Sequence, residues 1–174
     1  MQAPTHILAG KIIQQLTDRR DYQFLVVALT FFLGLLFHAI FDKLARMTYH
    51  PPNADFTDYF WVFYHLLVLL TTIVFLYLYG AEAKWGIFFS ILPDLDWVFI
   101  HGQTLLEIEM PFYREPHIHQ TINWVMDNIP PFILLNLLPD YRFFYWAVSL
   151  EVAFVGVLLL IIHRIKHSRR NIHF

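Results

Sequence analysis

The chain has 174 residues, of which 57% are hydrophobic, 18% aromatic and only 15% charged, and its mean hydropathy is +0.49. Soluble domains carry about a quarter charged residues, so this composition predicts an integral membrane protein. A net charge of −2 gives no reason to expect a nucleic-acid partner, and the absence of cysteine excludes disulfides, thiolate metal sites and cysteine nucleophiles.

Four apolar stretches have or approach the roughly 20 residues that a helix needs to cross a bilayer. They lie at 23–42, 58–79, 85–101 and 143–165. Residues 1–21 predict a short amphipathic helix and a turn, too polar to cross alone. The connection 102–141 predicts an outer loop with an interfacial segment. We therefore expect one all-α membrane domain over 1–174, a polytopic helix bundle of about four transmembrane helices plus the N-terminal helix.

Lysine and arginine residues beside the spans indicate the orientation, because they gather on the cytoplasmic side. Seven would share one side and four the other. This bias predicts a multi-pass protein with a cytoplasmic C-terminus and an outward-facing connection. The seven are Arg19, Arg20, Lys84, Arg164, Lys166, Arg169 and Arg170, and the four are Lys43, Arg46, Arg114 and Arg142.

Ionisable residues at membrane depth are expensive and usually mark a site or a pathway. Under this topology, those of the spans and of the connection fall toward the outer face. His6 joins them if the N-terminal helix packs antiparallel to the first span, since a rise of about 1.5 Å per residue brings it within about a turn of His38. The set consists of His6, His38, Asp42, His65, Asp94, Asp96, His117, His119 and Glu151.

The segment 38–42, His-Ala-Ile-Phe-Asp, places an imidazole and a carboxylate on one face of a helix. Such a pair can hold a divalent ion, and it can equally be an ion pair at a helix end.

The segment 92–96, Leu-Pro-Asp-Leu-Asp, indicates a broken helix. At a break, both carboxylates can turn toward one point, and unwound backbone is tolerated at membrane depth where it lines protein or a cavity. Helix capping would explain Asp94 but leaves Asp96 unexplained, so the motif favours a functional site.

The other ionisable residues allow two interpretations each. His117 and His119 would present both rings to one side if extended, either as metal ligands or as solvated histidines. Glu151 is either a carboxylate that orients a ligand or acts as a general base, or a protonated carboxyl bonded to a neighbouring helix. His65 is interpreted as a hydrogen-bonded core histidine.

These segments resemble the YdjM-type membrane-bound metal-dependent hydrolases, small multi-span proteins with a Gly/Thr-His motif near the N-terminus and LPDxDH, HRGxTH and HxxxD motifs. Residues 4–10 match the Gly/Thr-His motif, residues 92–96 match LPDxDH and residues 38–42 match HxxxD. Residues 117–121 resemble HRGxTH only loosely. Trp97 stands where the family has histidine, and HxxxD here precedes LPDxD. The resemblance implies a divalent metal and hydrolysis.

The leading prediction is a membrane-embedded metal-dependent hydrolase that acts through metal-activated water at the outer membrane face. Membrane lipids are the expected partners, and a lipid phosphoester or ester is the candidate substrate. Mixed imidazole and carboxylate ligation suits Zn²⁺ first, with Mn²⁺ or Fe²⁺ as alternatives, better than Mg²⁺ or Ca²⁺. The expected ligands are His6, His38, Asp42, Asp94, Asp96, His117 and His119, and the expected base is Asp96 or Glu151.

Two other functions stay open. A small proton or metal transporter would also need ionisable residues in the membrane, but it predicts polar residues that continue to the cytoplasmic side. Residues 24–36 of the first span are apolar apart from Thr30. A structural assembly subunit would use polar residues only to join helices, which leaves so many potential ligands at one depth unexplained.

Overall fold

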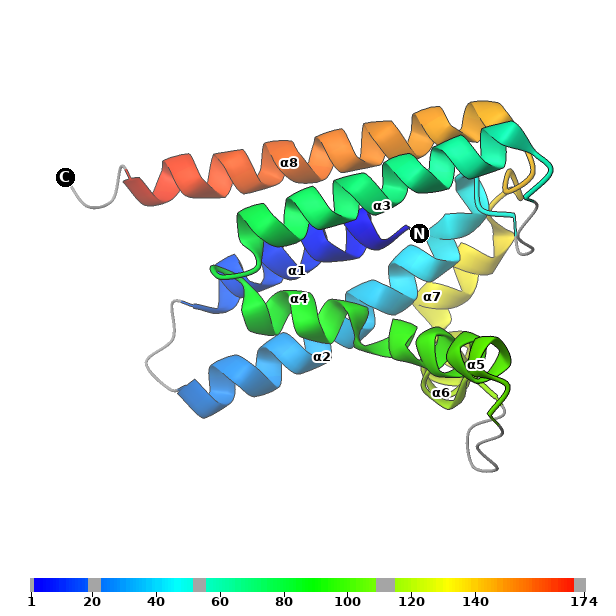
Figure 1. Cartoon of the computed structure of the whole chain (residues 1–174). Coiled ribbons are helices and arrows are strands. Elements are labelled where there is room, and N and C mark those ends of the chain that lie inside the picture. The colour runs from blue at the N-terminus through cyan, green and yellow to red at the C-terminus, as the bar shows by residue number, and fades with distance from the viewer. Residues whose placement is uncertain (1, 19–22, 52–55, 109–114, 171–174) are drawn as a thin grey trace.

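Helices make up all the regular structure in the residues that the computed structural model describes, which are 2–18, 23–51, 56–108 and 115–170. The predicted all-α fold class is confirmed. Arg19, Arg20 and Arg114, which entered the charge count, lie outside the described residues. The elements are α1 (Ala3–Thr17), α2 (Gln23–Leu44), η1 (Ala45–Met47), α3 (Tyr59–Tyr79), α4 (Lys84–Ile91), η2 (Leu92–Asp94), α5 (Leu95–Leu106), α6 (His117–Asp127), α7 (Pro130–Ile133), η3 (Leu134–Leu137), η4 (Tyr145–Ala147) and α8 (Val148–Arg170) (Figure 1).

Three of the described helices are long and apolar enough to cross a membrane, which identifies a membrane protein. They are Gln23–Met47, Tyr59–Tyr79 and Tyr145–Ser168. The stretch 85–101, expected as a further span, is divided instead into α4 and α5 by the single turn η2. Pro93 causes this break, because proline lacks the N–H for the helical ladder and its ring crowds the preceding turn.

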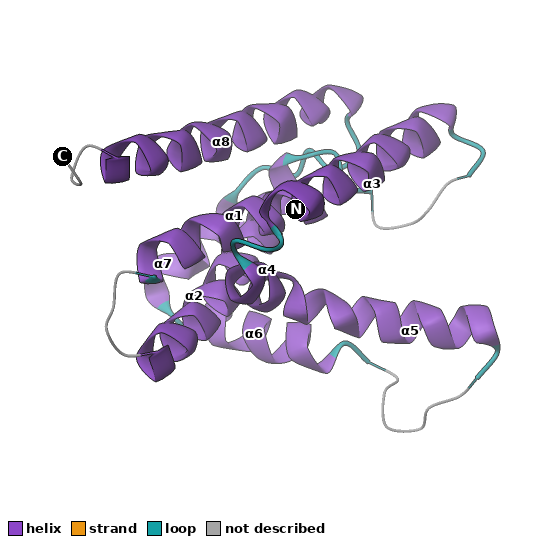
Figure 2. Cartoon of the chain, turned by 60° about the vertical axis from the view of Figure 1, so that its left-hand side comes forward, coloured by secondary structure: helices purple, strands orange, loops and turns teal. Residues whose placement is uncertain are grey.

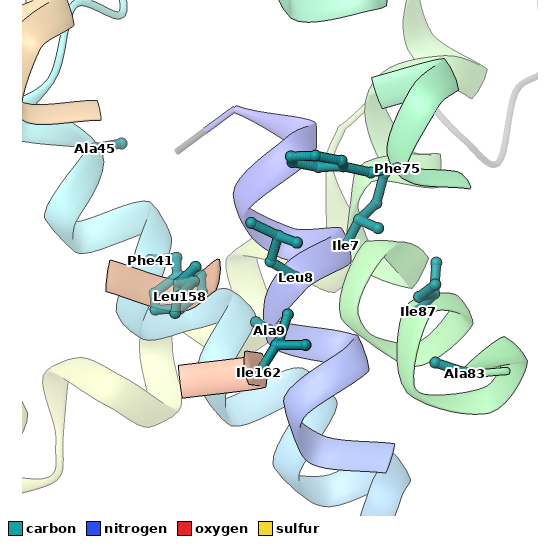
Figure 3. Packing of buried hydrophobic residues seen from close by; sticks show 10 residues of the cluster. All are labelled: Ile7, Leu8, Ala9, Phe41, Ala45, Phe75, Ala83, Ile87, Leu158 and Ile162. Carbon is teal, nitrogen blue, oxygen red and sulfur yellow. The ribbon is translucent and has the colours of Figure 1, made fainter. Parts of the chain in front are cut away.

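The N-terminal helix α1 lies at the centre of the bundle. It packs against α4 and against α2, α3 and α8, which form the three candidate spans. Twelve of its fifteen residues are buried, so the helix expected to be amphipathic is enclosed on nearly every side. Figure 3 shows the apolar core around it, formed by Ile7, Leu8, Ala9, Phe41, Ala45, Phe75, Ala83, Ile87, Leu158 and Ile162.

Polar side chains of α1 find partners on the surrounding helices. The side-chain oxygen of Gln14 accepts a hydrogen bond from the backbone N–H of Gly86 in α4, at 2.9 Å. The hydroxyls of Thr17 and Thr30 in α2 are hydrogen-bonded at 2.9 Å. Within a membrane, polar groups have to be satisfied by the protein itself. These bonds explain how so polar a helix can lie between apolar spans.

Two glycines face each other where α1 crosses α4. A Cβ atom added to Gly10 would lie 2.5 Å from the carbonyl oxygen of Gly86, and one added to Gly86 would overlap the carbonyl of Gly10. Backbones of membrane helices approach this closely only where the residues are small. The crossing fixes α4, and with it the turn that carries Asp94, against the helix that carries His6.

The two ends of the bundle differ. The start of α2 and the C-terminal end of α8 lie at one end, whereas α5 and α6 lie toward the other (Figure 1). Helix α6 packs against α2 and beside α5, and α5 projects away from the bundle (Figure 2). The second half of α2, which carries His38 and Asp42, thus faces the short helices that follow the proline break.

Candidate metal centre

Four separate elements bring five ionisable side chains together. These side chains form two groups that share His38, and within each group one ligand atom per residue lies within 4.8 Å of the others. Such buried histidine and aspartate groups can hold a metal ion. The first group is His6, His38 and Asp42, from α1 and α2, and the second is His38, Asp94 and His119, from α2, η2 and α6.

The nitrogens of two histidines and one oxygen of Asp42 form a nearly equilateral triangle. Asp42 Oδ2 lies 3.1 Å from His38 Nε2 and 3.4 Å from His119 Nε2. The two nitrogens are 3.3 Å apart. Ligand atoms that share one tetrahedral metal ion with bonds of about 2.0–2.1 Å are separated by about 3.3–3.4 Å, so these three atoms can hold one ion. Asp94 Oδ1 lies beside the triangle, 3.8 Å from each nitrogen.

The ring of His38 is held with its Nε2 lone pair toward this triangle. Its Nδ1 lies 2.8 Å from the carbonyl oxygen of Ser90. Because a carbonyl oxygen can only accept, Nδ1 carries the proton and donates it. Ser90 lies in the last turn of α4, where carbonyl groups lack helical partners. Sequence reasoning missed this contact, since a backbone carbonyl leaves no signal in the residue type.

Asp96 orients His119 from the opposite side of the ring. Its Oδ2 accepts a hydrogen bond from the backbone N–H of His119 at 2.8 Å and lies 3.2 Å from His119 Nδ1. Pro116, which precedes α6, offers no side-chain cap, so the carboxylate of Asp96 serves as one. Asp96 was expected as a ligand or base, but it lies on the Nδ1 side and belongs to neither ligand group. A carboxylate behind a ligating histidine fixes its tautomer and direction.

The electrostatics at His119 favour a cation. Burial lowers the pKa of His119, but its hydrogen bonds with Asp42 and Asp96 and the negative charges of Asp42 and Asp94 outweigh burial and raise the pKa above its usual value. Two imidazole nitrogens only 3.3 Å apart also repel each other unless a proton or a metal ion lies between them. A proton and a metal ion therefore compete for the same place.

His6 approaches the other oxygen of Asp42. Its ring is 1% exposed and stacks on the ring of His38, with centroids 4.3 Å apart. His6 Nε2 lies 3.5 Å from Asp42 Oδ1, which is too long for a good hydrogen bond. Neither ring nitrogen of His6 has a hydrogen-bond partner.

Glu151 belongs to α8, and its side chain reaches the N-terminal end of α1. It lies outside both ligand groups. One of its carboxylate oxygens accepts hydrogen bonds from the hydroxyl of Thr5, at 2.5 Å, and from the backbone N–H of Gln2, at 3.4 Å. A carboxylate at a helix N-terminus is favoured by the exposed N–H groups and the helix dipole. Glu151, expected as a base or an orienting residue, therefore fixes the helical turn that carries His6.

Two further histidines lie outside the two ligand groups. His117 and His119 were expected to share one side of an extended segment, but that segment is the helix α6. Side chains two positions apart on a helix point in different directions, and His117 is exposed. His65 donates from Nδ1 to the carbonyl of Trp61 at 2.8 Å, which makes it a hydrogen-bonded histidine.

Comparisons with protein-family models, with curated proteins and with solved structures find no match to this chain. The resemblance of its short motifs to the YdjM-type family stays a prediction. What this site can do is therefore argued from the distances between its own side chains.

Proposed function

We propose that this protein is a membrane-embedded metal-dependent hydrolase, the activity implied by the YdjM-type motifs. His38, His119 and Asp42 are the ligands of its metal, with Zn²⁺ first and Mn²⁺ or Fe²⁺ as alternatives. The observation that carries this proposal is the triangle of 3.1–3.4 Å between their ligand atoms. Catalytic zinc sites combine three protein ligands with an open position. A divalent ion held there would polarise the scissile group and make water a nucleophile near neutral pH.

Asp94 is the base in this proposal. The side chains of Asp42 and Asp94 are 27% and 38% exposed, whereas those of the two histidines are almost fully buried, so substrate and water approach from the carboxylate side. Asp94 lies beside the triangle, at 3.8 Å from both histidine nitrogens. A carboxylate in that place can take the proton that the attacking water loses.

A lipid is the substrate class that the surroundings of the site favour. The exposed side chains at the start of α5 include Leu95, Trp97, Val98 and Phe99, although α5 is too short to cross a bilayer. Helices with such apolar surfaces lie in the membrane interface. The rings of Trp97 and His119 are 5.5 Å apart, so this apolar surface reaches the site. The ester or phosphoester bond of a lipid, which lies next to its acyl chains, would then reach the metal site.

The depth of the site agrees with such a substrate. His38 and Asp42 precede the end of their span, Met47, by nine and five residues, or about 14 and 8 Å along the helix. Both residues therefore lie in the second half of this candidate span, toward one of its ends. With the basic C-terminal end of α8 in the cytoplasm, the site faces the extracytoplasmic side.

A proton or metal pathway is the second candidate, and the buried polar residues of α1 favour it. Lys11 and Gln15 follow His6 along α1 and are buried. The side-chain oxygen of Gln15 has no hydrogen-bond partner. Lys11, however, forms an ion pair with Glu82, whose side chain is exposed, so its charge already has a partner at the surface. Ion flux into vesicles would favour the pathway, and turnover of lipid without flux would favour the hydrolase.

The decisive experiment measures metal bound to detergent-purified protein by mass spectrometry, beside His38→Ala and Asp42→Ala. His163→Ala is the matched control, since His163 is an exposed histidine of α8. Zn, Mn or Fe in the parent and the control, lost from both site variants, supports the proposal. A parent that binds no metal above background after reloading overturns it.

Turnover is then tested on lipid phosphoesters and esters in mixed vesicles. Asp94→Asn should keep its metal and lose most activity, because the amide cannot accept the proton. Full activity of Asp94→Asn would exclude Asp94 as the base and leave the metal site in place.

A further inference from the structure

We infer that His6 and Asp42 hold a second divalent metal ion, so that the centre is binuclear and Asp42 is its bridging carboxylate. This inference rests on the proposed function, because it takes the ion on His38, His119 and Asp42 as the first of the two.

The two oxygens of Asp42 face different imidazoles. Oδ2 lies 3.1 Å from His38 Nε2 and 3.4 Å from His119 Nε2, whereas Oδ1 lies 3.5 Å from His6 Nε2. An ion on the first triangle uses Oδ2, whereas Oδ1 is the oxygen that faces His6. Two-metal hydrolytic sites hold their ions about 3.5–4 Å apart, a spacing that one carboxylate can bridge with its two oxygens.

His6 is buried beside Asp42 Oδ1, at 3.5 Å, without a hydrogen bond to either of its ring nitrogens. Its ring is 1% exposed, and neither nitrogen makes a hydrogen bond. Buried polar groups are nearly always paired, and an unpaired one needs an explanation such as an ion. The protein nevertheless holds this ring firmly: Thr5, the preceding residue, is bound to Glu151, and the ring itself stacks on His38 at 4.3 Å. A histidine kept in place with a free nitrogen beside a carboxylate oxygen has the chemistry of a metal ligand.

The second position differs from the first in the number of its ligands. His6 Nε2 and Asp42 Oδ1 are its two protein atoms, so water or substrate oxygens complete its coordination. It therefore binds its ion more weakly than the first position does. A pair of ions favours a phosphoester over a carboxylic ester, because two ions together stabilise the attacking and leaving oxygens of an in-line displacement at phosphorus.

The test is equilibrium dialysis of the purified protein against Mn²⁺, with bound metal measured by mass spectrometry and paired ions detected by electron paramagnetic resonance. The parent should bind two ions per chain, the weaker one giving a spin-coupled signal. His6→Ala and His6→Gln should both bind one ion and lose the coupled signal. Retention of that one ion shows that these variants are folded. His65→Ala, a histidine outside the ligand groups, should bind two ions like the parent.

Three results would overturn the inference. A parent that saturates at one ion, with no change in His6→Ala, removes the second position and leaves the proposed hydrolase intact. Two ions in both His6 variants would place the second ion elsewhere. A parent without any bound ion would end both proposals together.

Discussion

Substitution of Gly10 by alanine should separate α1 from α4 and weaken both the fold and the metal centre. The added Cβ would lie 2.5 Å from the carbonyl oxygen of Gly86, and ordinary contact begins at 3.4 Å, so the backbones must part by about 0.9 Å. Overpacking of this kind costs about 1–3 kcal/mol, at the upper end here because both sides are backbone. Alanine regains about 1 kcal/mol in helix propensity. The net loss is therefore about 2 kcal/mol.

Thermal unfolding in detergent measures this effect. A loss of about 2 kcal/mol lowers the melting temperature of a chain of this size by about 4–8 °C. Gly156→Ala on α8 is the matched control, because no atom lies within 4 Å of its added Cβ. The control should be neutral or slightly stabilised. Metal affinity should fall in Gly10→Ala alone, since α4 carries the carbonyl that orients His38. A Gly10→Ala protein as stable as the control would refute the close crossing.

Three further predictions concern the residues around the ligands. Asp96→Ala should weaken metal binding about 10–100-fold, or about 1.4–2.8 kcal/mol, in competition with a chelating dye, whereas Asp127→Ala, at the end of the helix α6 that carries His119, should not. Metal affinity should fall as the pH decreases from about 8 to 5, because the raised pKa of His119 lets protons displace the metal first at this ligand; an affinity independent of pH would exclude His119 from the site. Glu151→Gln should lower stability by about 1–2 kcal/mol in thermal unfolding, since the start of α1 loses a carboxylate acceptor, and an unchanged melting temperature would contradict a stabilising role of these hydrogen bonds.

The sequence was sufficient for the features that depend on local spacing. Apolar length alone indicates α2, α3 and α8 as candidate membrane helices, because such runs are long enough to cross a bilayer. The spacing of His38 and Asp42 places them on one helical face, and Pro93 marks a break in the chain. Helix rise was enough to suggest that His6 lies near His38, whose ring it contacts.

Features that depend on tertiary partners could not be read in this way. The central position of α1 depends on hydrogen bonds such as that between Gln14 and Gly86. A polar sequence does not reveal which groups will be the hydrogen-bond partners of its side chains. The sequence predicted Asp96 as a ligand, but in the structure it accepts a hydrogen bond from the backbone N–H of His119 at the start of α6. The separation of His117 from His119 depends on whether their segment is helical, and its short polar sequence did not decide that.

The burial of α1 dictates an order of assembly. This helix precedes the three candidate spans of the described residues, yet a segment with Lys11, Gln14 and Gln15 cannot partition into lipid unaided. It has to dock between helices already inserted, and its Thr5 meets Glu151 only after another 146 residues have been made. Among the helices that it contacts, α1 is thus the last to reach its position. A chain interrupted before α8 would lack the acceptor that fixes the turn of His6.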